Sequence, residues 1–216
     1  MVVPVYNEAA VVGTVVEAVL HAFPHVVCVD DASTDASAEA ARRAGAVVVQ
    51  HPINLGQGAA IQTGLAYALT DPAMRYAVTF DADGQHRVVD AAAMVERLRT
   101  EPLDVLIGSR FLDSRTRLSP LKRAVLRAGV AYTNATTGVR MTDAHNGLRA
   151  MDREVVAGLR ITQNRMAHAS EIVEQIGASD WRWGEHPVEI LYTHYSRTKG
   201  QSVWNSVNIL TELFFR

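Results

Sequence analysis

The sequence predicts an α/β fold in which a mostly parallel sheet is flanked by helices within a single domain. In the first half of the 216 residues, short apolar runs alternate with stretches of helical periodicity, as in successive strands and crossover helices. Hydrophobic residues make up 48% of the chain and charged residues 20%, so the chain can bury a sizeable core and is neither disordered nor fibrous. The net charge of −2 supplies no basic field for nucleic acid, which we exclude as a partner.

Strands and helices are expected to alternate through residues 1–112. Apolar runs predict strands at residues 2–5, 25–29, 46–49, 76–80 and 105–107. Helical spacing predicts helices between them, at residues 8–22, from a cap at Ser33 or Thr34 to residue 44, at 54–69, and at 91–99. These steps fit a parallel sheet with right-handed crossovers.

The second half has a different pattern. We expect helices at residues 118–136 and 167–176 and an apolar strand at 188–192, with polar, irregular stretches at 142–147 and 196–200. No Pro-rich or Ser-rich linker divides the chain, so both halves are assigned to one domain.

Residues 202–216 predict an amphipathic terminal helix. Its apolar positions recur at helical spacing, in Val203, Val207, Leu210 and Phe214. The segment is too short and polar to span a bilayer, so we expect it to lie on a membrane surface or to dock on a membrane-spanning partner. The alternative is that its apolar face packs on the sheet or forms a homodimer seam.

Cysteine usage and the absence of long apolar runs indicate the compartment. The single cysteine, Cys28, lies in an apolar run, which excludes a disulfide framework and a cysteine-based metal site. The sequence has no apolar run of about 18 residues and no signal-peptide pattern. We expect a cytoplasmic protein, either free or attached peripherally at the inner face of the membrane.

Polar side chains follow each expected strand of the first half. They are Pro4, Tyr6, Asn7 and Glu8, then Asp30 and Asp31, then His51 and Asn54, then Asp81, Asp83, Gln85 and His86, and finally Ser109 and Arg110. Ligands of open parallel sheets bind beyond the carboxyl ends of the strands. A single strand-end Asp is often a turn residue, but together these residues predict one acidic, ligand-binding edge.

The segment FDADGQH (80–86) is the most informative part of that edge. Asp81 and Asp83 leave an apolar strand one residue apart, and two such carboxylates offer hard oxygen ligands to Mg²⁺ or Mn²⁺ while leaving positions for phosphate and water. This predicts a metal site that handles a diphosphate. The alternative is a surface turn. Zinc is disfavoured because the eight His are scattered, and His86 is expected beside the site rather than as a ligand.

Two further features suit a nucleoside diphosphate. The glycines of NLGQGAAIQTG (54–64) open a helix, where free backbone N–H groups favour an anion; the alternative is that they permit close packing. Ile61 replaces the third glycine of the dinucleotide fingerprint, and there is no P-loop lysine. Arg110 would pair with a phosphate or form a structural ion pair.

Five segments, taken in order, closely resemble the family 2 inverting glycosyltransferases of the GT-A fold, a Rossmann-like architecture. They are VPVYNEA (3–9), VDDASTD (29–35), NLGQGAAIQTG (54–64), FDADGQH (80–86) and GSRF (108–111). The dolichol-phosphate mannosyltransferase-like and other polyprenyl-phosphate glycosyltransferases are the most similar branch. Downstream, HNGLRAM (145–151), ASEI (169–172) and SRTKGQS (196–202) resemble segments of that branch, although His145-Asn146 stands where Gln-Cys is common.

This resemblance implies transfer of a hexose from a UDP- or GDP-sugar to an acceptor, with inversion and with Mg²⁺ or Mn²⁺. Residues 1–112 would then be the nucleotide-sugar half and residues 113–201 the acceptor half. The residues implied to bind the nucleotide are Pro4, Tyr6, Glu8, Asp31, Asn54, Gly58 and Asp81. The implied metal and diphosphate ligands are Asp81, Asp83 and Gln85, and the implied catalytic residues are Asp83, Glu171 and Arg110.

The resemblance favours a polyprenyl phosphate, dolichyl or undecaprenyl, as the acceptor. Arg197 and Lys199 would grip its phosphate; the alternative is a solvated basic turn. A phosphate is already anionic at pH 7 and needs little help from a base, whereas a hydroxyl acceptor would need Glu171 or Asp143 to remove its proton. The alternative for Glu171 is a solvated position on a helix.

Other classes of protein share parts of this pattern. A haloacid-dehalogenase-like phosphatase also uses Asp-x-Asp-Gly after a strand, but its nucleophile strand normally opens the domain, whereas Asp30 and Asp31 precede Asp81 here. A receiver domain would end near 120 residues. A catalytically inactive, nucleotide-sugar-binding relative is the third alternative.

Overall fold

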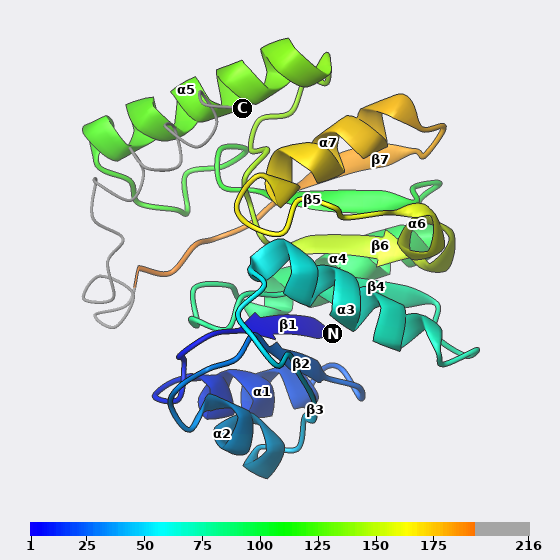
Figure 1. Cartoon of the computed structure of the whole chain (residues 1–216). Helices are drawn as coiled ribbons and strands as arrows, with labels where there is room; N and C mark the ends of the chain where they lie inside the picture. Colours follow the sequence, from blue (N-terminus) through cyan, green and yellow to red (C-terminus); the bar gives the residue numbers. More distant parts are fainter. Residues whose placement is uncertain (193–216) are drawn as a thin grey trace.

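Seven strands form one mixed sheet in residues 1–192, the part of the chain that the computed structural model describes (Figure 1). The strands are β1 (Val2–Val5), β2 (Val27–Asp30), β3 (Val47–Gln50), β4 (Tyr76–Thr79), β5 (Val105–Ser109), β6 (Arg149–Asp152) and β7 (Trp183–Pro187). Their order across the sheet is β3-β2-β1-β4-β6-β5-β7. Of these seven, β6 runs antiparallel to its neighbours β4 and β5, and the other pairs are parallel. The predicted α/β fold with a mostly parallel sheet is confirmed.

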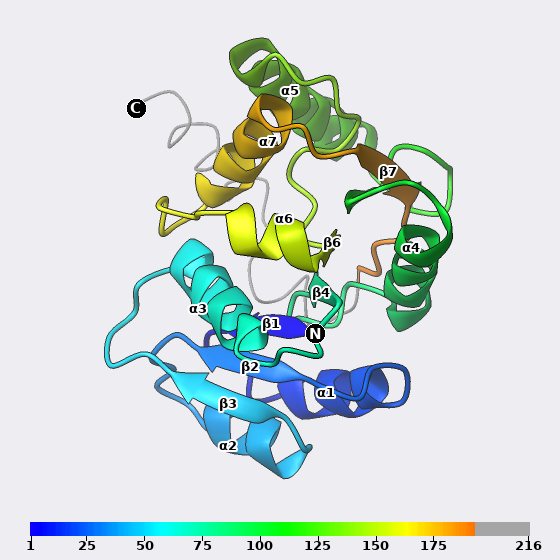
Figure 2. The ribbon, with the colours of Figure 1, turned by 90° about the vertical axis from the view of Figure 1, so that its right-hand side faces the viewer.

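The helices that follow the strands cover both faces of the sheet. They are α1 (Val12–Leu20), α2 (Ser37–Arg43), α3 (Gln57–Leu69), α4 (Val88–Thr100), α5 (Pro120–Thr137), α6 (Arg153–Gly158) and α7 (His168–Ala178). Alternate residues of a strand point to opposite faces, so each face has its own core. Val3 and Val5 of β1 share a core with α1, α2 and α4. Val2 packs instead with α3, α6 and α7, and Figure 2 shows these three helices on the side of the sheet opposite α1 and α4.

Helix α5 lies outermost and packs on α7 (Figures 1 and 2). Ser119 caps it by accepting the Lys122 N–H, Pro120 occupies the first turn, and Gly138 ends the helix with a φ of 73°. Only a narrow stripe around Val130 is buried. Within residues 1–192, no helix has both the length and the apolar character needed to cross a membrane.

The strand predicted at residues 188–192 is wrong. The last described strand is β7, a half-buried polar segment that pairs with β5. Val188 and Ile190 are buried. The Val188 N–H still donates to the carbonyl of Ser109, the last residue of β5, but the Ile190 N–H donates to the Thr116 hydroxyl, so the chain has left the sheet by Ile190. The apolar pattern therefore indicated burial and not strand pairing.

Two short elements, β6 and α6, were not predicted. Strand β6 has four residues and begins with Arg149, a charged residue in the middle of the sheet, so its segment carries no apolar run. Asp152 caps α6 by accepting the Val155 N–H at 2.8 Å. The first helix also begins later than predicted, at Val12.

The predicted cap at Ser33 or Thr34 is wrong as well. Helix α2 begins at Ser37, whose N–H donates to Asp35 at 3.0 Å. The Ser33 hydroxyl accepts the Asn7 N–H at 2.9 Å, and the Thr34 N–H donates to the Asn7 side chain at 2.8 Å. These residues therefore tie the loop after β2 to the loop after β1.

Some predictions fall outside residues 1–192. The acceptor-phosphate residues Arg197 and Lys199 and the terminal helix at 202–216 lie beyond the described residues. Their roles stay predictions.

Candidate active site

The carboxyl ends of β1, β2, β4 and β5 lie at one edge of the sheet because these strands run in the same direction. Strand β6 runs the opposite way, so its first residue, Arg149, and the turn before it reach that same edge. The edge therefore gathers residues from loops that are distant in the sequence, including Asp30, Asp81 and Arg110. This is the acidic edge that the sequence predicts.

Asp81 follows β4 and is held in a fixed orientation. Its Oδ1 accepts a hydrogen bond from Gln57 Nε2 at 3.0 Å, and its Oδ2 accepts one from His86 Nε2 at 2.9 Å. Burial acts to raise the pKa of Asp81, but the His86 bond and the positive charge of Arg149 outweigh it and lower that pKa. Asp81 is therefore a charged carboxylate with a defined direction.

Asp83 is a second carboxylate, and its pKa is shifted in the opposite direction to that of Asp81. The Gln85 N–H donates to its Oδ1 at 3.0 Å, and the Gln85 amide donates to its Oδ2. Burial and then the negative charge of Asp81 raise the pKa of Asp83 to about 6. Two carboxylates that repel each other in this way favour a cation between them.

The pair fits a hard divalent cation such as Mg²⁺ or Mn²⁺. Within the described residues, no three His, Cys, Asp or Glu side chains come together as a metal site. The two carboxylates would therefore leave several coordination positions to phosphate and water oxygens, which is how Mg²⁺ is commonly held with nucleotides. The amide nitrogen of Gln85, the expected third ligand, supports Asp83, and the metal role of Gln85 stays a prediction.

Asp31, at the end of β2, is buried and engaged within the protein. Its carboxylate accepts the N–H groups of Leu55 and Gly56 at 2.8 and 2.7 Å and bonds His51 Nδ1 at 2.8 Å. Its carbonyl accepts Asn54 Nδ2 at 3.2 Å. Asp31 and Asn54 thus shape the loop before α3, and their predicted contacts with a nucleotide stay predictions.

The expectation of free backbone N–H groups at the glycines before α3 is wrong. The Gly56 N–H binds Asp31, and the Gly58 N–H donates to the Asn164 carbonyl at 2.8 Å. A Cβ on either glycine would overlap the backbone of residues 163–164. The glycines therefore permit close packing, the alternative that the sequence left open, and a role of Gly58 toward the nucleotide stays a prediction.

The loop after β1 carries the remaining predicted nucleotide residues. Pro4 is half-buried in β1, and Tyr6 is 46% exposed beyond its end. The N–H of Glu8 donates to Ser37 Oγ at 2.7 Å, which fixes this loop against α2. An exposed aromatic ring on an anchored loop suits stacking against a base, so the role predicted for Tyr6 is retained as a proposal.

Arg110 follows β5 and forms a buried ion pair with Asp143. Its Nε donates to Asp143 Oδ2 at 2.6 Å, and its backbone N–H donates to the same oxygen at 3.0 Å. The side chains are 12% and 2% exposed, so the pair is shielded from water. Of the two alternatives for Arg110, the structure shows the ion pair, and a role toward substrate stays a proposal.

A second cation lies close to Arg110. Lys122 of α5 has its Nζ 4.0 Å from the centroid of the Tyr192 ring. Burial, and then the positive charge of Arg110, lowers the pKa of Lys122. The positive charge of Arg110 therefore reaches Lys122 even though Arg110 is paired with Asp143.

Glu171, the predicted base, holds a loop. Its carboxylate accepts hydrogen bonds from the Thr162 N–H and hydroxyl and from the Gln163 N–H, at 2.5 to 3.0 Å. Because Glu171 lies in the first turn of α7, it fixes the start of that helix to residues 162–163. A catalytic role for Glu171 stays a prediction.

Three buried side chains at the edge have polar atoms without a hydrogen-bond partner among the described residues: Asp30 Oδ1, His86 Nδ1, and Arg149 Nε and Nη1. Buried polar atoms normally have partners, so this concentration marks a place where a ligand is expected. The sequence analysis singled out neither Arg149 nor the pairing of Asp143. Signals were available in the charged residue inside the HNGLRAM segment and in the acidic residue three positions before Asn146.

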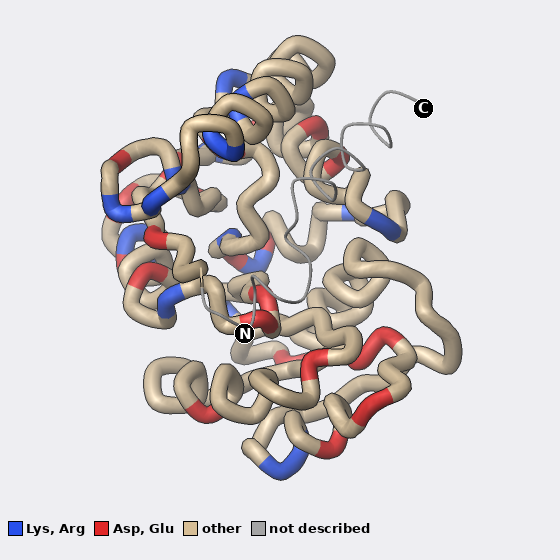
Figure 3. Tube along the Cα trace, turned by 90° about the vertical axis from the view of Figure 1, so that its left-hand side faces the viewer, with Lys and Arg blue, Asp and Glu red and all other residues tan. Residues whose placement is uncertain are grey.

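The two halves of the sequence differ in charge. Residues 1–112 contain 13 Asp or Glu and seven Lys or Arg, whereas residues 113–216 contain ten and 14. From Ser114 to Thr142 there are six Lys or Arg and no Asp or Glu, and Figure 3 shows the basic positions of α5 on the long helix at the top of the view. The segment between β5 and β6, which both begins and ends at the acidic edge, is therefore rich in positive charge.

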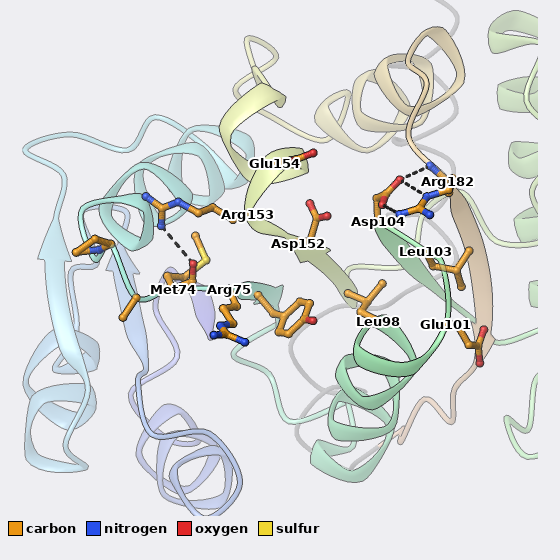
Figure 4. A pocket seen from close by; sticks show the side chains of 13 residues that line it. Met74, Arg75, Leu98, Glu101, Leu103, Asp104, Asp152, Arg153, Glu154 and Arg182 are labelled. Atoms are coloured by element: carbon orange, nitrogen blue, oxygen red, sulfur yellow. Dashed lines mark hydrogen bonds and ion pairs between the residues drawn. The ribbon is translucent and has the colours of Figure 1, made fainter.

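A hollow of about 540 Å³ lies elsewhere, at the opposite edge of the sheet (Figure 4). Its polar groups bind each other: Arg182 pairs with Asp104 at 2.5 Å, and Arg153 donates to the Met74 carbonyl at 3.2 Å. It is open and contains none of the strand-end residues described above. We assign the chemistry to the acidic edge because the charged carboxylates and the unpartnered polar atoms lie there.

Residues 1–159 match the family described as Glycosyl transferase family 2. The chain belongs to that family and is a glycosyltransferase with the GT-A fold. Solved structures agree on the fold: glucosyl-3-phosphoglycerate synthase from Mycobacterium tuberculosis, crystallised with Mn²⁺ and UDP-glucose, has a TM-score of 0.72 with 17% identity, over 98% of this chain and 74% of that chain.

Relatives with known names point to one branch of the family. The UDP-N-acetylglucosamine–dolichyl-phosphate N-acetylglucosaminyltransferase of Methanococcus voltae is 27% identical over 99% of this chain and 93% of its own length. The dodecaprenyl-phosphate galacturonate synthase of Rhizobium johnstonii is 38% identical over 100% of this chain and 66% of its own length. An uncharacterized protein of Methanocaldococcus jannaschii is 31% identical over 100% of this chain and 90% of its own length. The predicted resemblance to polyprenyl-phosphate glycosyltransferases is confirmed.

Proposed function

We propose that the protein transfers a hexose from a UDP- or GDP-sugar to a polyprenyl phosphate, with inversion, using Mg²⁺ or Mn²⁺ at Asp81 and Asp83. The observation that carries the donor side is this carboxylate pair at the carboxyl edge of the sheet, one member charged and oriented and the other with a pKa raised to about 6 by burial and by its neighbour. The names of the relatives support the acceptor.

The engagement of both predicted bases, Asp143 and Glu171, favours a phosphate acceptor. Asp143 is paired with Arg110, and Glu171 is bound by residues 162–163. A hydroxyl acceptor would need one of these carboxylates to take its proton, whereas a phosphate oxygen is already an anion at pH 7. Arg110 and Lys122 supply cations that suit such an acceptor.

In the proposed reaction an oxygen of the acceptor phosphate attacks the anomeric carbon from the face opposite the diphosphate. A bond forms between that oxygen and the carbon, the bond from the carbon to the diphosphate oxygen breaks, and the nucleoside diphosphate leaves with the electron pair. No proton transfer is required. The bound metal would neutralise charge on the leaving diphosphate, while Gln57 and His86 keep Asp81 directed at the site.

The test uses radiolabelled UDP-glucose, UDP-N-acetylglucosamine, UDP-galacturonate and GDP-mannose with undecaprenyl or dolichyl phosphate in detergent. We expect labelled lipid from one donor, loss of product with excess chelator, and recovery with Mn²⁺ or Mg²⁺. Labelled lipid that is undiminished in chelator would contradict the metal role. Nucleotide binding without transfer from any donor would instead support the inactive relative.

A further inference from the structure

Arg149 is a buried cation that none of the roles assigned above requires. The residue is 1% exposed and is among the largest fully buried side chains of residues 1–192. Its Nε and Nη1 have no hydrogen-bond partner within this part of the chain. Arg110, also buried, makes an ion pair at 2.6 Å, so burial alone does not leave a guanidinium unpartnered here.

The position of Arg149 places its charge beneath the site. In the sheet it pairs with Thr79 on β4, two residues before Asp81, and with Ile107 on β5, three residues before Arg110. The Thr79 hydroxyl donates to the Gly147 carbonyl at 2.7 Å, and a Cβ on Gly147 would overlap the Asp81 carboxylate. The turn leading into Arg149 is therefore packed directly against Asp81.

Its electrostatic partners are the carboxylates of the site. Burial lowers the pKa of Arg149 to about 10, and the negative charges of Asp81 and Asp143 oppose that change. The guanidinium is thus charged at neutral pH. Asp143 is bonded to Arg110, and Asp81 to Gln57 and His86. Arg149 Nε and Nη1 reach neither carboxylate, so both act on Arg149 through space.

A buried charge that lacks hydrogen-bond partners on two of its nitrogen atoms is costly and is retained where something repays that cost. Replacement by an apolar side chain of similar volume is often neutral or stabilising, so packing does not explain an arginine at this position. A nucleoside diphosphate or an acceptor phosphate would bring the missing negative charge to this edge of the sheet. Coulomb interactions across a poorly solvated interior are strong enough to act without contact.

We propose that Arg149 is a fixed positive counter-charge for the phosphate groups bound at this site, acting through space from beneath Asp81. The inference rests on the proposed function and deepens it, because it names a residue that favours the diphosphate in the bound state and as the leaving group. Arg149 is a positioning residue and not a contact to substrate.

The proposal predicts opposite changes in two binding affinities, one for the nucleotide and one for Mn²⁺. In Arg149→Met the loss of positive charge should weaken binding of UDP or GDP at least tenfold, while Mn²⁺ alone should bind as tightly as in the parent or more tightly, because a cation is no longer repelled. Arg149→Lys, which keeps the charge, should restore nucleotide binding to within about threefold of the parent. Titration calorimetry measures both constants without sugar transfer, so failure of the proposed function does not affect the test.

Arg153→Met is the matched control. It also removes a cation, but Arg153 donates to the carbonyls of Leu69, Asp71 and Met74 at the other edge of the sheet, so it should lower the melting temperature and leave both constants unchanged. Parent-like nucleotide binding by Arg149→Met would overturn the proposal. So would weakening of both Mn²⁺ and nucleotide by Arg149→Met without rescue by Lys, which would indicate structural damage.

If the donor assay gives product, it also separates the two phosphate sources. An increase in the donor KM or a fall in kcat with unchanged acceptor KM would assign the counter-charge to the diphosphate. A change confined to the acceptor KM would show that Arg149 acts on the acceptor phosphate and would overturn its proposed action on the donor diphosphate.

Discussion

Two strand ends of this molecule carry paired acids, and they do different work. Asp31, after β2, is buried, and its carboxylate is hydrogen-bonded to the N–H groups of Leu55 and Gly56 and to the His51 ring. Asp83, after β4, lies close enough to Asp81 that burial and the neighbouring charge raise its pKa to about 6. Similar acidic patterns in the sequence therefore mark a hydrogen-bonded scaffold at one strand end and the proposed reactive centre at the other. The charge repulsion between Asp81 and Asp83, rather than residue type, separates the two.

Asp83→Asn should produce the largest effect on activity. Loss of one metal carboxylate should reduce kcat by roughly 10³-fold or more, since metal stabilisation of the leaving group is worth several kcal/mol. Stability should not fall: with its pKa raised in the folded state, ionised Asp83 disfavours folding above about pH 6. Activity and urea unfolding at pH 8 test both statements, with exposed Asp180→Asn as the charge control. Parent-like turnover would remove Asp83 from the reactive centre.

Asp31→Ala should show the reverse pattern. Two backbone N–H groups and His51 lose a charged acceptor, which should lower the free energy of unfolding by about 3 kcal/mol. Asp71→Ala is the control, because exposed Asp71 accepts one local bond, from the Ala73 N–H at 2.8 Å. Urea unfolding measures both. A change below about 1 kcal/mol for Asp31→Ala would break the comparison.

Gly147→Ala tests the packing that fixes Asp81. The added methyl group would overlap the Asp81 carboxylate, so that side chain must turn away from Gln57 and His86. We expect a fall in kcat of roughly 10²-fold, since misplacement of a reacting group by about 1 Å can cost that much. Gly138→Ala, where a Cβ meets nothing within 4 Å but φ is 73°, should instead cost stability alone. Equal kinetics for Gly147→Ala and the parent would contradict this account.

His168 should make the protein less stable in acid. Burial, and then the charge of Arg149, lowers the pKa of His168 to about 4, whereas the unfolded state titrates near pH 6.5. Between these values the unfolded state binds more protons, so stability is lost as the pH falls from 6.5 toward 4, by up to about 3 kcal/mol. In His168→Gln this part of the pH dependence should disappear. Parallel unfolding curves for the two proteins would show that His168 does not titrate as described.

Ala32→Gly should give the smallest effect. Ala32 follows Asp31 with a φ of 60°, a left-handed conformation that costs an L-residue about 1 kcal/mol and glycine nothing. Because glycine also gains freedom when unfolded, which opposes this gain, the net rise in unfolding free energy should be a few tenths of a kcal/mol. Thermal unfolding at matched pH detects it. A lower melting temperature would show that the Ala32 methyl group contributes packing that outweighs the strain.

The sequence predicted much of residues 1–112 and less of the rest of the described chain, for physical reasons. Strands β1, β2, β4 and β5 have apolar runs because both faces of the sheet are covered there. Strand β6 begins with a buried arginine and β7 is half-buried and polar, so neither carries such a run. The positions of the strand ends were enough to predict the acidic edge, but the hydrogen-bond partners of its residues could not be predicted. No local pattern indicates that Asp143 binds Arg110, 33 residues away, or that Glu171 binds residues 162–163.

The reversed direction of β6 has a consequence for engineering. Because this strand enters the sheet from the active edge, the whole segment between β5 and β6 begins and ends at the site, next to Ser109 and Arg149. Both ends of this segment are therefore fixed at neighbouring positions of the sheet. The segment contains α5 and the six Lys or Arg residues between Ser114 and Thr142. Residues 110–148 therefore form one segment that can be replaced as a unit, because both of its junctions lie at the same edge of the sheet.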